Sequence, residues 1–129
     1  MPSDPTLRVL IVDDEHNIAD TLALILEKRG HVVRTAYSGE DAVRIAQSFH
    51  PHAVVSDVFM PGMTGIDLAI WLAENCPDCK VLLISGNASA FPMVEESIGR
   101  GHTHSILTKP VHPMQIIDFV ASCAPLPSA

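Results

Sequence analysis

The chain has 129 residues, of which 47% are hydrophobic and 18% charged, and its net charge is −7 with histidine neutral. This length and composition predict one folded domain and argue against disorder. An acidic chain with eight Lys and Arg residues does not favour direct binding to nucleic acid or to an anionic membrane. No apolar run approaches the ~20 residues of a membrane span, and residues 1–5 lack a signal-peptide pattern, so we expect a cytoplasmic protein.

Short apolar runs alternate with segments that carry apolar residues at helical spacing. The runs predict five strands, at residues 7–12, 32–36, 53–56, 80–84 and 105–108. The helical patterns, with their capping and stop signals, fall within residues 18–30, 38–49, 64–73, 91–99 and 113–123. We therefore expect one domain over residues 1–129, with a core at about 7–123 and flexible tails at 1–5 and 124–129.

Five strand–helix alternations predict an α/β fold with a parallel sheet and helices on both faces. A barrel needs about 250 residues, so the expected fold is a five-stranded, doubly wound sheet of order 2-1-3-4-5 with five helices, as in flavodoxin-like (βα)5 proteins. The strand at 32–36 is the most polar, which indicates a sheet edge.

Four of the five predicted strands end in a polar residue capable of chemistry. These residues are Asp13 with Asp14, then Asp57, Ser85 and Lys109. Taken singly, each is most simply a turn residue or a surface lysine, and Asp57 alone could equally be a strand-capping aspartate. In a parallel sheet, however, all these ends lie on one edge, where open α/β folds place their ligands. Their coincidence favours a functional site.

Three carboxylates at one edge repel one another unless positive charge lies among them. Asp13, Asp14 and Asp57 contribute −3 and Lys109 contributes +1, so a divalent cation would bring the sum to zero. Oxygen ligands without histidine or cysteine favour Mg²⁺. A carboxylate, a hard cation, a lysine and a hydroxyl together indicate phosphoryl transfer, with the carboxylate as nucleophile.

Four motifs carry a resemblance to a known family. They are Val12-Asp13-Asp14-Glu15, the pattern D-x-x-M-P-x-M-x-G from Asp57 to Gly65, Ser85-Gly86, and Thr108-Lys109-Pro110. With them the chain resembles the response regulator receiver domains of bacterial two-component systems, over essentially its whole length. It is most similar to the stand-alone type represented by the chemotaxis response regulator.

The resemblance implies that Asp57 accepts a phosphoryl group from a sensor histidine kinase or a phosphotransfer protein. It implies that Mg²⁺ is bound by Asp14, Asp57 and the carbonyl of Phe59, with Asp13 acting through water. Such a protein is a signalling domain rather than an enzyme, since it catalyses only its own phosphorylation and dephosphorylation.

The resemblance also implies that Ser85 and Lys109 bind the phosphoryl group and that the peptide bond before Pro110 is cis. The family usually has an aromatic switch residue three positions before the lysine, where this chain has Ile106. The phosphorylation chemistry does not depend on that residue, but signal output does. We expect a downstream protein to bind the face formed by the last strand and the last two predicted helices.

Two other classes of function remain to be weighed. A flavodoxin-like nucleotide or flavin binder would need a phosphate loop after the first strand, where this chain has Asp13 and Asp14. An interaction module with a degenerate site is disfavoured because the site residues are all present. Within the receiver reading, a phosphorelay intermediate and a regulator with its own output both stay open.

Cys76 and Cys79 have C-x-x-C spacing, but without two further ligands we interpret them as incidental thiols.

Overall fold

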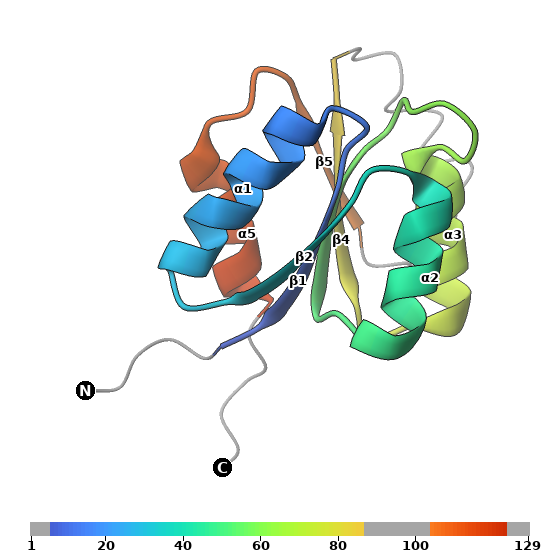
Figure 1. The fold of residues 1–129 in the computed structure, drawn as a ribbon, viewed down its shortest axis with the longest axis horizontal. Helices are drawn as coiled ribbons and strands as arrows, with labels where there is room; N and C mark the ends of the chain where they lie inside the picture. The colour runs from blue at the N-terminus through green and yellow to red at the C-terminus, as the bar shows by residue number, and fades with distance from the viewer. Residues whose placement is uncertain (1–5, 87–103, 124–129) are drawn as a thin grey trace.

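The structure is a computed structural model that describes residues 6–86 and 104–123. Its five strands are β1 (Arg8–Val12), β2 (Val32–Ala36), β3 (Ala53–Asp57), β4 (Lys80–Ser85) and β5 (His104–Thr108). All neighbouring strands pair in parallel in the order β2-β1-β3-β4-β5, which confirms the predicted sheet (Figure 1).

Four helices lie within the described residues: α1 (His16–Lys28), α2 (Gly39–Phe49), α3 (Gly65–Asn75) and α5 (Pro113–Ser122). The predicted helix at 91–99 and the predicted tails at 1–5 and 124–129 lie outside the described residues. Helices α1 and α5 cover one face of the sheet, and α2 and α3 cover the other (Figure 1).

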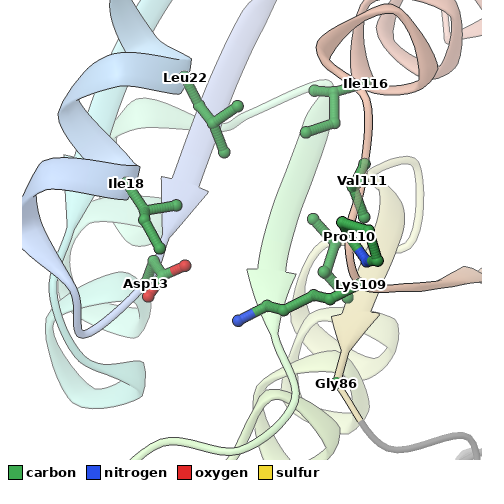
Figure 2. Close-up of a pocket in the computed structure, with 9 residues that line it drawn as sticks. Asp13, Ile18, Leu22, Gly86, Lys109, Pro110, Val111 and Ile116 are labelled. Atoms are coloured by element: carbon green, nitrogen blue, oxygen red, sulfur yellow. The ribbon is translucent and has the colours of Figure 1, made fainter.

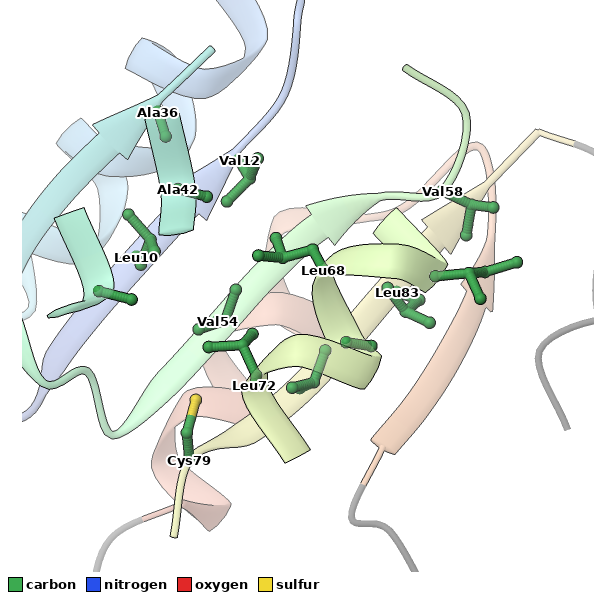
Figure 3. Packing of buried hydrophobic residues seen from close by; sticks show 14 of the residues in the cluster. Leu10, Val12, Ala36, Ala42, Val54, Val58, Leu68, Leu72, Cys79 and Leu83 are labelled. Carbon is green, nitrogen blue, oxygen red and sulfur yellow. The ribbon is translucent and has the colours of Figure 1, made fainter. Parts of the chain in front are cut away.

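The central strands are buried on both faces, as their continuous apolar runs predict. Successive side chains of a strand point to opposite faces, so β1 contributes to two separate cores. Leu10 and Val12 pack with α2 and α3 (Figure 3), whereas Val9 and Ile11 pack with α1 and α5. The sheet is thereby held between two apolar layers, and its carboxyl edge remains for polar groups.

Side-chain caps set where α2 and α3 begin. The Ser38 hydroxyl accepts a hydrogen bond from the backbone N–H of Asp41 at 3.1 Å. Thr64 and Asp67 form a reciprocal capping box, in which each side chain accepts the other's backbone N–H, at 3.1 and 3.2 Å. Both caps were predicted from sequence, since each pattern is local. The second cap ends the loop that follows Asp57.

Gly65 lets the start of α3 lie directly against the end of β3. A Cβ atom at this position would overlap the carbonyl oxygen of Asp57 and lie 3.0 Å from the Cα atom of Val58. The Gly65 N–H donates to the Val58 carbonyl at 2.8 Å, so the two backbones are in contact. Any larger residue would have to displace either the helix or the strand end that carries Asp57.

We therefore expect Gly65→Ala to lower the free energy of unfolding by about 2 kcal/mol or more, as overpacking against backbone does. Gly86→Ala is the matched control, because within residues 6–86 and 104–123 a Cβ atom at Gly86 would approach nothing closer than Lys109 Cδ at 4.0 Å. Urea unfolding of both variants provides the measurement. Equal stabilities for the two variants would contradict the proposed close packing at Gly65.

Candidate functional site

Asp57 is the last residue of β3 and is only 8% exposed. Two backbone hydrogen bonds hold Val58, the residue directly after it. The Val58 N–H donates to the Ile84 carbonyl at 2.9 Å, which continues the pairing with β4, and the Val58 carbonyl accepts from Gly65 at 2.8 Å. The carboxylate is thus fixed at the carboxyl edge of the central strand, as the sequence predicted.

Asp13 and Asp14 reach the same edge from the end of the neighbouring strand β1. Asp13 is buried and Asp14 is exposed. The backbone N–H of Asp13 donates to the Ala36 carbonyl at 3.1 Å, and its Oδ1 accepts the Glu15 N–H at 2.9 Å. One carboxylate oxygen from each of Asp13, Asp14 and Asp57 lies within 4.8 Å of the others. The predicted cluster of three acids is therefore present.

Lys109 brings a positive charge to this cluster from the end of β5. Its Nζ lies 3.2 Å from Asp57 Oδ2, across 52 residues of sequence. Its backbone N–H donates to the Ser85 carbonyl at 2.8 Å, which extends the β4–β5 pairing by one residue. Ser85 is fully buried and ends β4, and the Lys109–Pro110 peptide bond is cis.

Burial raises the pKa of both buried acids above the ordinary value of an aspartate. For Asp57, the hydrogen bond and charge of Lys109 oppose this rise, and the charge of Asp14 adds to it. For Asp13, the Glu15 N–H opposes it, and the charges of Asp57 and Asp14 add to it. Burial by itself lowers the pKa of Lys109, but the hydrogen bond and charge of Asp57 outweigh it and leave that pKa raised. The cluster therefore retains uncompensated negative charge.

Two further predicted site residues, Phe59 and Ile106, contribute no side chain to this cluster of acids. The Phe59 side chain is 47% exposed, and the role of its carbonyl in metal binding stays a prediction. Ile106 pairs with Leu83 in the sheet and packs, half-buried, against the core beneath α2 and α3. Its role as a switch also stays a prediction.

The family model of the response regulator receiver domain matches residues 9–121 of this chain. The chain belongs to the response regulator receiver domain family. A relative from Leptolyngbya boryana, named as an uncharacterized 14.6 kDa protein in the sodA1 3' region, is 33% identical over 113 residues. The match covers 87% of this chain and 86% of that relative.

Solved receiver structures share the fold. A putative response regulator from Chloroflexus aurantiacus superimposes with a TM-score of 0.78 and 29% identity, over 92% of this chain and 98% of that one. A CheY-like receiver domain protein from Methanospirillum hungatei gives a TM-score of 0.81 at 24% identity, over 92% and 93% of the two chains, which shows the fold alone.

Several relatives are longer than this receiver domain. The alkaline phosphatase synthesis transcriptional regulatory protein PhoP of Bacillus subtilis is 30% identical over 109 residues. That match covers 84% of this chain but 45% of PhoP. The whole activity of such regulators therefore does not carry over to this chain. None of the helices described in this receiver is long and apolar enough to cross a membrane.

The receiver site has a donor set that fits Mg²⁺. Among the described residues, the three aspartates are the group of acids, histidines and cysteines close enough to share a metal ion. All three offer oxygen, which hard cations prefer over nitrogen or sulfur. The raised pKa of Asp13 and of Asp57 shows that a nearby cation would be favourable.

The cysteines of the receiver lie elsewhere. Cys76, Cys79 and Cys123 are all free thiols. The Cys79 N–H donates to the Cys76 carbonyl at 3.0 Å in the turn before β4, and Cys79 is buried. Among the described residues, the group close enough to share a metal ion contains none of these cysteines. That they are incidental thiols stays an interpretation.

Two features near the receiver site were not foreseen from sequence. The sequence marks Gly65 only as the last residue of the motif that begins at Asp57, whereas the structure shows that it lets α3 contact the backbone of Asp57. An apolar cavity adjoins Lys109 and Asp13. Its walls come from helices far apart in the sequence, so no local pattern marks it.

Asp13→Asn should stabilise the metal-free receiver at neutral pH. Because the folded-state pKa of Asp13 is raised, its ionised form opposes folding above that pKa. The opposition disappears as the pH falls through the folded-state pKa. The gain should therefore be largest at neutral pH and shrink under acidic conditions.

Urea unfolding in the presence of a chelator, over a series of pH values, measures this gain. Asp78→Asn, in the exposed turn before β4, serves as the matched control and should show no such pattern. A gain for Asp13→Asn that is the same at every pH would contradict the electrostatic explanation.

Proposed function

We propose that this receiver accepts a phosphoryl group on Asp57 from the phosphohistidine of a sensor histidine kinase or a phosphotransfer protein. The observation that carries the proposal is the single buried carboxylate at the end of the central strand, 3.2 Å from the Lys109 ammonium. Asp13 and Asp14 supply the further oxygen donors that a metal-assisted phosphoryl transfer requires.

In the proposed reaction, one carboxylate oxygen of Asp57 attacks the phosphorus atom and forms a P–O bond. The P–N bond to the donor histidine breaks, and the imidazole nitrogen leaves with the electron pair and takes a proton from solvent. The product is an acyl phosphate. Lys109 lies where its ammonium can bind a phosphoryl oxygen, and Ser85 ends the adjacent strand, where its hydroxyl is assigned the same task.

Mg²⁺ is the proposed cofactor. Asp14, Asp57 and the Phe59 carbonyl would hold it, with Asp13 acting through water. When bound, it supplies the positive charge that offsets the carboxylates and the phosphoryl oxygens. Without it, the charges of Asp13, Asp14, Asp57 and Lys109 sum to −2, and an incoming phosphoryl group would be repelled.

Output is proposed to occur through altered binding to a downstream protein in the cytoplasm, without direct contact to nucleic acid or membrane. The proposed face comprises β5, α5 and the predicted helix at 91–99. Within the described part of this face, Met114 is 42% exposed, and Ile106 of β5 packs half-buried against the core beneath α2 and α3. Because Ile106 is β-branched and has no ring to move, the switch should depend partly on the partner.

Asp57→Asn should abolish Mg²⁺-dependent phosphorylation and leave the fold intact, since the amide is no nucleophile but keeps the shape of the side chain. Mass spectrometry after incubation with a small phosphodonor should show an adduct of about 80 Da on the wild type only. Asp78→Asn, at the opposite edge of the sheet, should be phosphorylated normally. An adduct that persists in Asp57→Asn would contradict the assignment.

Mg²⁺ should stabilise the wild type, because it binds a cluster that only the folded chain assembles. An excess of about 100-fold over the dissociation constant gives roughly 2.7 kcal/mol. Asp14→Ala should remove most of that gain, and because Asp14 is exposed the substitution should not unfold the protein. Thermal melts with and without Mg²⁺ measure it. A variant that responds to Mg²⁺ as strongly as the wild type would rule out Asp14 as a ligand.

A further inference from the structure

A cavity of about 460 Å³ lies between α1 and the segment that leads from β5 into α5 (Figure 2). Most of its lining is apolar and comes from α1, from α5, from β4 and from the segment after Lys109. The apolar lining residues are Ile18, Leu22, Ile84, Pro110, Val111 and Ile116. Its volume falls within the range of small-molecule sites, roughly 300–1,000 Å³.

The charged lining of the cavity belongs to the phosphoacceptor site. Asp13 and Lys109 both line it, and the Lys109 side chain extends across it toward Asp13 (Figure 2). The ammonium of that lysine is 3.2 Å from Asp57 Oδ2. The cavity therefore has one charged end, formed by Asp13 and by the lysine that pairs with Asp57, and one apolar end between two helices.

We propose that this cavity binds the hydrocarbon chain of a small acyl phosphate, so that the receiver prefers apolar acyl phosphates over acetyl phosphate as direct phosphodonors. The proposal rests on the proposed function, because Asp57 is the acceptor in both. It adds the class of phosphodonor, and the residues that would select an apolar donor are Ile18, Leu22 and Ile116.

The transfer balances without any further reactant. An oxygen of Asp57 attacks phosphorus, the bond between phosphorus and the acyl oxygen breaks, and the carboxylate leaves with the electron pair. No proton has to be supplied, since the leaving group is a carboxylate. An anionic head fits Lys109, and the proposed Mg²⁺ would add further positive charge for it, whereas the acyl chain needs surroundings without charge. The cavity offers both in one continuous space.

The effect should grow with chain length. Each methylene that leaves water completely strengthens binding roughly fourfold. Hexanoyl phosphate has four methylenes more than acetyl phosphate and a leaving group of similar basicity. The cavity is partly open, so the methylenes do not leave water completely. At donor concentrations well below saturation, we expect hexanoyl phosphate to phosphorylate Asp57 faster than acetyl phosphate by about tenfold or more.

The quantity to measure is the rate of phosphorylation by hexanoyl phosphate divided by the rate with acetyl phosphate. Mass spectrometry follows the adduct on Asp57 in the presence of Mg²⁺. Ile18→Gln should lower the ratio by about threefold or more, because it replaces an apolar wall at a position that is 36% exposed and tolerates polarity. Leu24→Gln is the matched control. Leu24 lies on the same helix, is 53% exposed and does not line the cavity, so its ratio should equal that of the wild type.

Binding without reaction gives a second readout. Hexylphosphonate cannot transfer its phosphorus group, and it should shift the amide resonances of Ile18, Leu22, Val111 and Ile116 at concentrations where methylphosphonate does not. If acetyl phosphate labels Asp57 and the longer donor is no faster, the preference is overturned and the proposed function stands. If neither donor labels Asp57, the proposed function is overturned. Loss of the chain-length effect in Leu24→Gln would show that the effect does not arise in the cavity.

Discussion

The crowding of three carboxylates around one ammonium group is the constraint on which this receiver site depends. The sheet order places β1 beside β3, so Asp13 and Asp14 necessarily arrive next to Asp57. Lys109 alone leaves a net charge of −2 among these four groups. Burial of two of the acids makes that excess costly while they are ionised, and at neutral pH a ligand that carries positive charge would relieve the cost.

The fold tolerates this cost because its own stability comes from elsewhere. The strand ends are held by uncharged backbone bonds, such as those from Val58 to Ile84 and from Lys109 to Ser85. The two apolar cores lie on either side of the sheet and do not involve the carboxylates. Consequently the electrostatic state of the site can change while the scaffold keeps its geometry. A site that must be occupied and vacated repeatedly needs that separation.

Local patterns made much of the fold predictable. The caps at Ser38 and Thr64 were visible because a cap needs only residues within one helical turn. The strand at Val32–Ala36 was read as an edge because its side chains are the most polar, and it pairs with β1 alone. The alternation of strands and helices along the chain indicated a parallel sheet, and a parallel sheet brings Asp57 and Lys109 to the same edge. The family resemblance supported the strand order.

The features that sequence did not predict depend on distances between elements that are far apart in the chain. The role of Gly65 is an overlap with the carbonyl of Asp57, which no propensity encodes. The cavity exists because side chains from α1 and α5 leave space between them, and their volumes are not set by any periodic pattern. Sequence motifs can indicate which residues come together. The distances between those residues follow only from the three-dimensional structure.

Lys109 joins the phosphoacceptor and the cavity into one physical unit. Its ammonium pairs with Asp57, its side chain lines the cavity, and Pro110 and Val111 directly after it also line the cavity. A group that fills the charged end of the cavity and a group bound to Asp57 would therefore both lie beside Lys109. If a ligand in the cavity favours a particular position of Lys109, it changes the free energy of binding at Asp57. Binding at Asp57 then changes the affinity of the cavity by the same free energy, because coupling between two sites is reciprocal. Under the proposed function, a receiver built in this way would link the shape of a phosphodonor to the charge on Asp57 through the side chain of Lys109.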